Sequence, residues 1–302
     1  MTDHLIQRDV PLARLSTLRV GGVARTLLTP RHSDDLADFL QAADREGRPA
    51  AILGRGSNTL IRDGVIETPV ILMSHFSRRI CVNSDSGEIS ADAGAPLPEI
   101  ARRAADAGIA GLEFLAVIPG LLGGGVIMNC GIGGPGGPSA AHTLVSVDSI
   151  DFLGHHSRTK TEDLFVRYRS IRLPREGVVT RAVLVGKPGH KPTDLHAEID
   201  RLKAERRLRQ PHTRRTSGSV WLPAQGRPAG AIIDESGLRG FSVGRATISR
   251  DHANWIEVRR GCTSDEVMGL VESLECRVHA ITGVMLEREV CLLPQSPKLL
   301  RP

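Results

Sequence analysis

A glycine-rich segment at residues 116–137 restricts the fold of this 302-residue chain more than any other feature. It reads AVIPGLLGGGVIMNCGIGGPGG, and nine of its 22 residues are glycine, with no charged residue among them. Glycine loses more backbone entropy on folding than any other residue, so a segment this rich in glycine is costly to order. We therefore expect a physical reason for the bare backbone, such as the close approach of a ligand.

The composition predicts a soluble globular protein that does not bind nucleic acid. Hydrophobic residues make up 40% of the chain and charged residues 24%, which is typical of globular domains. Aromatic residues make up only 3%, too few for a surface that stacks bases. The net charge is +5, and the densest basic cluster is ERRLRQPHTRR at residues 205–215. This cluster fits either a solvated helix end and linker or a site for an anionic small molecule, because arginine binds phosphate and carboxylate groups well.

The sequence predicts neither a metal site nor a membrane span. Its five cysteines are scattered and form no CxxC pair, which argues against a zinc site or a disulfide framework. The histidines lack ligand spacing, so we interpret His252 as a structural hydrogen-bonding residue. The first residues, MTDHLIQRDVPL, lack the apolar core of a signal peptide, and no apolar run reaches the roughly 18 residues that span a bilayer. We expect a cytoplasmic protein.

Hydrophobic periodicity predicts an α+β fold in three units. Ser33 is expected to cap the first helix. Helical spacing is clearest in four segments, residues 33–47, 97–108, 194–210 and 264–283. Strands are predicted from short apolar or alternating runs at residues 50–54, 68–73, 79–84, 87–94, 144–154, 178–186, 240–249, 254–258 and 286–293.

Two glycine loops could each hold a phosphate group. LGRGSN (residues 53–58) follows a predicted strand, and its backbone N–H groups could form an anion-binding nest. PGLLGGGVIMNCG (residues 119–131) could lead into a helix N-terminus. Neither fits a Rossmann fingerprint or a P-loop, because the third glycine and the GK[ST] ending are missing. Tight turns explain each loop taken singly, whereas the two together favour a dinucleotide held between two walls.

Nine motifs along the chain resemble, in order, those of the UDP-N-acetylenolpyruvoylglucosamine reductase family. They cover almost the whole sequence: STLRVGG, LGRGSNTLIRDG, GLEFLAVIPGLLGGGVIMNCG, YRSIRLP, RQP, SGSVW, AGAIIDESGLRG, HAN and LEREV. No tyrosine lies between Arg169 and Ser219, so the chain resembles the shorter, second type of the family. The resemblance implies an α+β fold with a two-part FAD-binding domain of the vanillyl-alcohol-oxidase type and a small α+β C-terminal substrate domain.

The resemblance also implies a domain division and an activity. We expect residues 1–75, with 285–302 returning to them, and residues 76–190 to form the two FAD-binding parts, and residues 191–284 to form the substrate domain. The activity is that of a cytoplasmic FAD-dependent oxidoreductase of peptidoglycan precursor synthesis. It passes hydride from NADPH through FAD to the enolpyruvyl group of a UDP-sugar. The expected partner is an anionic small molecule, and the expected state is a monomer or weak dimer.

Three residues carry the chemistry that the resemblance implies. Ser219 in SGSVW corresponds to the proton donor, Arg169 in YRS to the residue that binds the substrate carboxylate, and Glu289 in LEREV to the acid that polarises the intermediate or completes the proton relay. A turn serine, a surface ion pair and an edge-strand charge are the structural alternatives. Tyr168 and Arg214 are the further substrate-binding candidates.

The FAD-binding candidates fall in the two glycine loops. The first loop is expected to wrap the pyrophosphate, and the second to face the flavin and its phosphates. The residues assigned to FAD are Gly54, Arg55, Gly56, Ser57, Asn58, Pro119, Gly120, Gly123, Gly124, Asn129 and Gly131.

Three departures from the family pattern concern the substrate side. GSVFKNP becomes GSVWLPA, which places Leu222 and Pro223 where a lysine and an asparagine are expected. NAGAYG becomes NCGIGG, with Ile132 and Gly133 in place of alanine and tyrosine, and LEPEV becomes LEREV, which introduces Arg288. Two alternatives therefore stay open: a paralogous FAD oxidoreductase acting on another substrate, and a flavin-binding protein without turnover.

Overall fold

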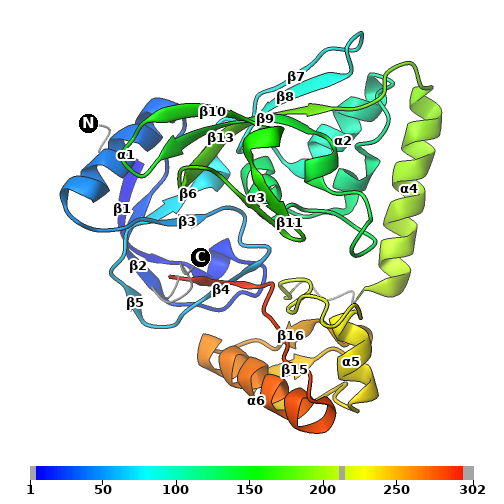
Figure 1. Cartoon of the computed structure of the whole chain (residues 1–302). Helices are drawn as coiled ribbons and strands as arrows, with labels where there is room; N and C mark the ends of the chain where they lie inside the picture. Colours follow the sequence, from blue (N-terminus) through cyan, green and yellow to red (C-terminus); the bar gives the residue numbers. More distant parts are fainter. Residues whose placement is uncertain (1–4, 211–214, 295–302) are drawn as a thin grey trace. The chain divides into compact units, whose positions relative to one another are not determined.

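The chain folds into two compact units, each with its own hydrophobic core (Figure 1). The computed structural model describes residues 5–210 and 215–294. Strands β1 (Ile6–Pro11) and β2 (Val23–Leu28) are divided between the units. Unit 1 comprises Met1–Gln7, Leu27–Gly54 and Pro69–Arg206, and unit 2 comprises Arg8–Thr26, Arg55–Thr68 and Arg207–Pro302.

Unit 1 is built on an antiparallel five-stranded sheet in the order β10-β9-β13-β8-β7. The hairpin between β9 and β10 turns at Gly154, whose φ of 86° is the left-handed conformation that glycine adopts without strain. Helix α3 (Leu122–Ile127) packs against β13 and β8, and helix α2 (Leu97–Asp106) packs against β8 and β7 (Figure 1). The five strands are β7 (Ile80–Val82), β8 (Glu88–Asp92), β9 (Leu144–Asp151), β10 (His156–Lys160) and β13 (Gly177–Val185).

A short parallel array in unit 1 positions the first glycine loop. Strand β6 (Val70–Leu72) pairs with the end of β2 on one side and with β3 (Ala51–Leu53) on the other. Because β3 ends at Leu53, the LGRGSN loop begins at the carboxyl end of a parallel strand, where α/β sheets commonly place ligands. A separate hairpin joins β11 (Phe165–Arg167) and β12 (Ser170–Arg172).

Helices α1, α2 and α4 lie where the periodicity predicted them, with one wrong cap, whereas α3 was not among the predicted helices. Helix α1 begins after His32, not at a capping Ser33, because the Asp35 carboxylate accepts hydrogen bonds from the backbone N–H groups of Arg31 and His32. The Asp35 carboxylate thus satisfies N–H groups at the start of the helix, and no serine hydroxyl is needed there. The helices are α1 (Ser33–Arg45), α2 (Leu97–Asp106), α3 (Leu122–Ile127) and α4 (Pro192–Arg209), whose last residues, from Arg207, belong to unit 2.

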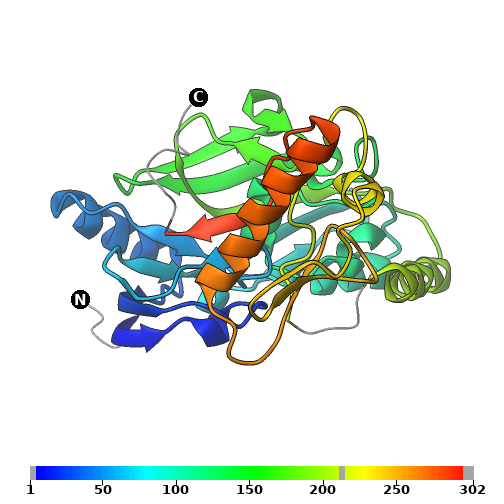
Figure 2. The same ribbon diagram turned by 90° about the horizontal axis from the view of Figure 1, so that it is seen from below.

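Unit 2 packs helix α6 (Ser264–Thr282) against a small antiparallel sheet in the order β14-β15-β16 (Figure 2). A capping box between Thr263 and Glu266 starts α6, and Gly283 ends it with a φ of 71°. The apolar residues at helical spacing in the predicted segment 264–283 are buried and belong to the core: Val267, Leu270, Val271, Leu274 and Val278.

The remaining strands of unit 2 include one that returns from the end of the chain. Strand β17 (Cys291–Leu293) pairs in parallel with β4 (Thr59–Ile61). The predicted strand at 240–249 is a hairpin, because the chain turns at Gly244, whose φ is 55°. The other elements are β5 (Val65–Ile66), β14 (Ser242–Val243), β15 (Ala246–Ile248), β16 (Ile256–Val258) and helix α5 (Ala229–Glu235).

Single 3-10 turns connect several of these elements. They are η2 (Ala13–Leu15), η3 (Met73–His75), η4 (Glu113–Val117), η5 (Ala140–His142) and η6 (Thr161–Asp163). Across residues 5–210 and 215–294, no helix has both the length and the apolar character needed to cross a bilayer.

Candidate active site

Protein packing explains part of the glycine-rich segment of unit 1. The backbone N–H groups of Leu122 and Gly123 donate to the carbonyls of Ala95 and Ala93, which places α3 directly against the end of β8. A Cβ atom on Gly123 would lie 3.0 Å from the Cβ of Ala93, and one on Gly131 would lie 2.3 Å from the carbonyl oxygen of Pro138. Gly131 is therefore required by a close contact with the backbone, and Gly123 packs tightly on Ala93.

Gly124 and Gly54 are different, because no such contact explains them. A Cβ built on either residue would have no protein atom within 4 Å in the described part of the chain, and neither has a positive φ. Gly124 lies inside α3, where alanine is the better helix former. A planar ring or a phosphate group can approach the backbone closely only where no side chain intervenes. The open space at these two glycines therefore fits FAD.

Asn129 joins the second glycine loop to the hairpin that carries Arg169. Its side-chain amide donates to the carbonyl of Arg167 at 2.9 Å, and its Oδ1 accepts from the N–H of Ala141 at 3.0 Å. The residue is buried and has a φ of 39°. Its side chain thus holds three loop segments together, and its predicted contact with FAD stays a prediction.

Arg169 is held in a strained turn at the tip of the β11–β12 hairpin. Arg167 pairs with Ser170, which leaves Tyr168 and Arg169 as a two-residue connection. Arg169 has a φ of 56°, an uncommon conformation for a residue with a side chain, and such strain concentrates at functional sites. Its Nη2 donates to the carbonyl of Gly131 at 2.8 Å, and its guanidinium lies 4.9 Å from the ring centroid of Tyr168. The two substrate candidates of unit 1 are therefore in contact.

In unit 2, the STLRVGG motif fixes the RGSN loop. Gly56 has a φ of 64°, and a Cβ on it would lie 2.4 Å from the carbonyl oxygen of Leu15. The backbone N–H and the hydroxyl of Thr17 both donate to the Gly56 carbonyl, at 3.0 and 3.2 Å. This loop is thus clamped to a neighbouring segment, and Arg55 is exposed beside it.

Ser219 and Glu289 lie on neighbouring segments of unit 2. The N–H of Glu289 donates to the carbonyl of Val220 at 2.8 Å, and the side chain of Asn58 donates to the carbonyl of Glu289 at 3.1 Å. Ser219 follows Gly218, which turns the chain with a φ of 77°. The structure therefore brings together the segments of two of the three catalytic candidates and one FAD candidate, through hydrogen bonds to backbone carbonyls. The third catalytic candidate, Arg169, belongs to unit 1.

This pairing corrects the strand predicted at residues 286–293. The regular strand is only β17, from Cys291 to Leu293. The preceding residues pair instead with the segment after Ser219, through an isolated bridge between Trp221 and Arg288. The chain changes partners at Val290, because the N–H of Cys291 bonds to the carbonyl of Asn58.

Asn254 supports the Ser219 segment, a role that the sequence reasoning did not assign. Its Oδ1 accepts from the N–H groups of Val220 and Trp221 at 3.1 and 2.9 Å, and its Nδ2 donates to the Trp221 carbonyl at 2.9 Å. The residue is 8% exposed. The HAN motif was the available signal, since a buried asparagine needs hydrogen-bond partners.

Trp255 supplies a buried donor next to Ser219. The two residues form an antiparallel bridge. The Trp255 indole N–H is buried and has no hydrogen-bond partner among the described residues. Buried donors are normally satisfied, so an acceptor on a bound molecule would complete this one.

The His252 ring is expected to make stability depend on pH. Its Nδ1 accepts from the N–H of Asn254 at 3.2 Å, and burial, with a smaller effect of Arg239, lowers the pKa of His252 below 6.5. The unfolded chain therefore binds more protons below pH 6.5, and stability is lost as pH falls from 6.5 towards the folded pKa. Urea unfolding at pH 7.5 and pH 5 should show a smaller loss for His252→Gln than for the wild type. The exposed His279, changed to glutamine, is the control, and an equal loss in all three proteins would contradict the prediction.

Cysteine reactivity should separate buried from exposed thiols. Burial raises the pKa of Cys130 and of Cys262 to about 12 and also raises that of Cys291, so these thiols stay protonated and shielded. Cys81 and Cys276 are exposed. We expect two thiols per chain to react rapidly with a disulfide reagent at pH 8 and all five after unfolding. Cys276→Ser should reduce the rapid count to one, and a third rapid thiol in the wild type would refute the assignment.

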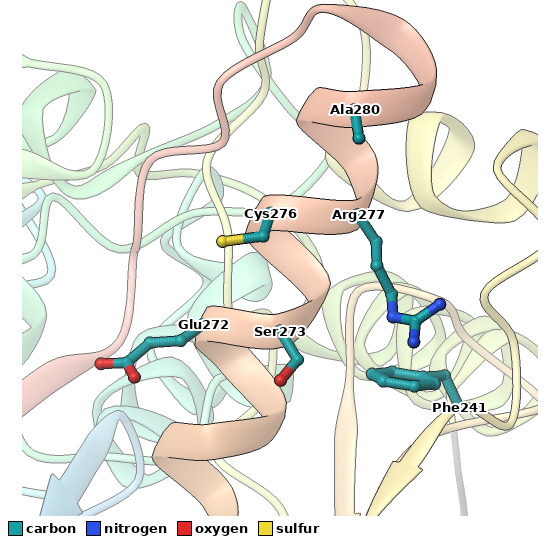
Figure 3. Close-up of a pocket in the computed structure, with 6 residues that line it drawn as sticks. All are labelled: Phe241, Glu272, Ser273, Cys276, Arg277 and Ala280. Atoms are coloured by element: carbon teal, nitrogen blue, oxygen red, sulfur yellow. The ribbon is translucent and has the colours of Figure 1, made fainter.

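A shallow hollow on the outer side of α6 has a different character (Figure 3). Its volume is about 500 Å³, and the Arg277 guanidinium stacks 4.7 Å from the ring centroid of Phe241. None of the predicted site residues lines it; the lining residues are Phe241, Glu272, Ser273, Cys276, Arg277 and Ala280. Arg214, the remaining substrate candidate, lies outside the described residues.

Two family models match the chain. One, described as the C-terminal domain of UDP-N-acetylenolpyruvoylglucosamine reductase, matches residues 210–293, and one described as an FAD binding domain matches residues 24–160. The α+β fold with an FAD-binding domain is therefore confirmed.

Relatives and a solved structure match along almost the whole length. The UDP-N-acetylenolpyruvoylglucosamine reductase of Azorhizobium caulinodans is 36% identical, covering 93% of this chain and 89% of the relative. That of Synechococcus sp. (strain WH7803) is 33% identical, covering 95% and 92%. The crystal structure of the Thermus caldophilus enzyme matches with a TM-score of 0.77 and 31% identity, covering 95% of this chain and 98% of that one. The chain belongs to the UDP-N-acetylenolpyruvoylglucosamine reductase family.

Proposed function

We propose that this protein is an FAD-dependent UDP-N-acetylenolpyruvoylglucosamine reductase that uses NADPH to form a peptidoglycan precursor. The observation that carries this proposal is the collinear match, at 33–36% identity over 93–95% of the chain, to enzymes of that name. The match extends through both the FAD-binding region and the C-terminal region. The alternatives of a paralogue on another substrate and of a non-catalytic flavoprotein are not needed to explain such a match.

When bound, FAD would supply redox chemistry, carrying hydride from NADPH to the enolpyruvyl double bond of the substrate. Gly54 and Gly124 leave open space in which this group would lie, and the RGSN loop, clamped by Thr17, would hold its pyrophosphate. Of the predicted FAD contacts, those of Pro119, Gly120, Gly123, Asn129 and Gly131 rest on the family motif alone.

The residues of the chain stabilise charge and move the proton. Addition of hydride to one alkene carbon leaves negative charge on the neighbouring carbon and its carboxylate. Arg169 binds that carboxylate, and its strained turn and its bond to Gly131 hold the guanidinium in place before the substrate arrives. Ser219 gives its hydroxyl proton to the carbon, and Glu289 completes the relay. Tyr168 and Arg214 bind the rest of the anionic substrate.

Turnover of the named substrate tests this proposal. The purified protein should show the absorbance of oxidised flavin, and addition of UDP-N-acetylglucosamine enolpyruvate should start the consumption of NADPH. A protein that takes up no FAD on reconstitution would refute the flavoenzyme assignment. If NADPH bleaches the flavin but this substrate does not reoxidise it, the protein acts on a different substrate. Leu222 and Pro223, which replace the family's lysine and asparagine, would then be the residues that mark the change.

The remaining assignments follow from the same activity. Its reactants, a nucleotide sugar and NADPH, place the reaction in the cytoplasm. We assign the two FAD-binding parts to residues 1–75, with 285–302, and 76–190, and the substrate domain to 191–284. A monomer or weak dimer is the state expected in sedimentation velocity experiments.

A further inference from the structure

Two departures from the family pattern meet on one carboxylate. Trp221 replaces the phenylalanine of GSVF, and Arg288 replaces the proline of LEPEV. The indole Nε1 of Trp221 donates to Oε1 of Glu275 at 2.9 Å. Arg288 donates to the same carboxylate twice, from Nε at 2.8 Å and from Nη2 at 2.7 Å. Two departures that lie far apart in the sequence therefore share one hydrogen-bond acceptor, the Glu275 carboxylate on helix α6.

The backbone explains why these two side chains meet. Leu222 donates to the carbonyl of Glu287, and Glu289 donates to the carbonyl of Val220, so Trp221 and Arg288 form a pair flanked by hydrogen bonds but not joined by them. Side chains of such pairs lie closest together in an antiparallel ladder. The backbone N–H of Arg288 makes no hydrogen bond within the ladder, so the position tolerates both the proline of the family and the arginine of this chain.

The carboxylate lies between fixed elements and is largely shielded from solvent. The Glu275 side chain is 20% exposed and that of Arg288 is 30% exposed, while Trp221 is fully buried. Glu275 follows Leu274, which packs α6 into the core of unit 2. A bidentate arginine–carboxylate pair of this kind has a defined geometry, unlike an exposed surface pair.

We propose that Glu275 is a positioning residue that clamps the segment carrying Ser219 to the segment carrying Glu289. Trp221 lies two residues after Ser219, and Arg288 directly precedes Glu289. Glu275 thus fixes both segments against α6 from one side, while Asn254 holds the Ser219 segment from the other. The effect of this clamp on catalysis rests on the proposed function. Its effect on the structure can be measured without turnover.

Amide hydrogen exchange tests the clamp directly. In the flavin-loaded protein, Glu275→Ala should raise the exchange rate of the Leu222 and Glu289 amides by about tenfold or more, since their bonds join the two segments. The matched control is Glu272→Ala, one turn earlier on α6, which removes an exposed charge that acts on Arg288 only through a longer-range interaction. It should leave both amides unchanged. Unchanged exchange in Glu275→Ala would overturn the proposal, whatever the activity.

Half-reaction kinetics then test the consequence for catalysis. Glu275→Ala should slow reoxidation of the flavin by the enolpyruvyl substrate about tenfold, because small displacements of reacting groups are costly, and should leave reduction by NADPH within about twofold. Equal slowing of both half-reactions would indicate general damage and contradict a positioning role. A wild-type protein that the substrate does not reoxidise would refute the proposed function instead, and the exchange experiment would still decide the clamp.

A combined variant tests whether the effect passes through the two partners. In a Trp221→Phe/Arg288→Pro background, which restores the family residues, adding Glu275→Ala should change reoxidation by less than about twofold, because coupled residues are not additive. If that background does not fold, Trp221→Phe/Arg288→Met serves the same purpose. An undiminished effect of Glu275→Ala in either background would show that Glu275 acts through some other contact.

Discussion

Ser219→Ala is expected to bind FAD and to be reduced by NADPH as the wild type is, and yet to form product at least about 100-fold more slowly, the range lost with a general acid. Alanine removes only the hydroxyl group. The backbone of this segment is held by Asn254 and by the Glu289 N–H, and these bonds do not use the serine side chain. The loss should therefore appear in the proton transfer and not in folding. Stopped-flow absorbance of the flavin, with NADPH and substrate added in turn, separates the steps.

The control for this variant is Ser273→Ala, the same substitution on α6 at the hollow of Figure 3. It should retain full activity. Product formation by Ser219→Ala at the wild-type rate would remove Ser219 from its assigned role. Equal loss of both half-reactions would instead assign it to flavin binding.

Local patterns in the sequence predicted the elements, because periodicity depends only on neighbouring residues. The helices predicted at residues 33–47, 97–108 and 264–283 are examples, since each of these segments is helical. The pairing of residues 287–290 with 220–222 was missed, because alternation shows that a segment is extended but not which segment lies beside it. The strand predicted at residues 286–293 was consequently longer than the observed strand β17.

The interpretation of Arg288 was limited for the same reason. Its position beside Glu289 suggested an effect on the substrate, whereas the structure pairs its side chain with Glu275. Glu275 lies in no recognised motif and occupies an ordinary polar position of an amphipathic helix. Only the fold, by placing α6 beside two distant segments, shows that it has a role.

The glycine-rich segment shows how the structure divides a single prediction into two. The sequence suggested that one cause, a ligand, keeps the whole backbone bare. Gly131 is instead required by its contact with Pro138 and Gly123 packs closely on Ala93, whereas Gly124 has open space where its side chain would be and no positive φ. Substitutions at different glycines of one segment should therefore have different consequences.

Gly124→Ala is expected to keep or raise the stability of the flavin-free protein, by up to about 1 kcal/mol, because alanine is the better residue inside a helix and its Cβ meets no protein atom within 4 Å. It should weaken FAD binding about tenfold or more, which is about 1.4 kcal/mol, because the methyl group enters the space assigned to the flavin.

The matched control for Gly124→Ala is Gly137→Ala, whose Cβ would lie 2.1 Å from the carbonyl oxygen of Ile132. Overpacking of this kind should destabilise the flavin-free protein by about 1–3 kcal/mol. Urea unfolding without flavin and fluorescence titration with FAD measure the two quantities separately. Because the two variants differ in what their methyl groups meet, they should lose different properties. If Gly124→Ala bound FAD as tightly as the wild type does, the open space beside α3 would not be the flavin site, and the reason for glycine at this position would have to be sought elsewhere.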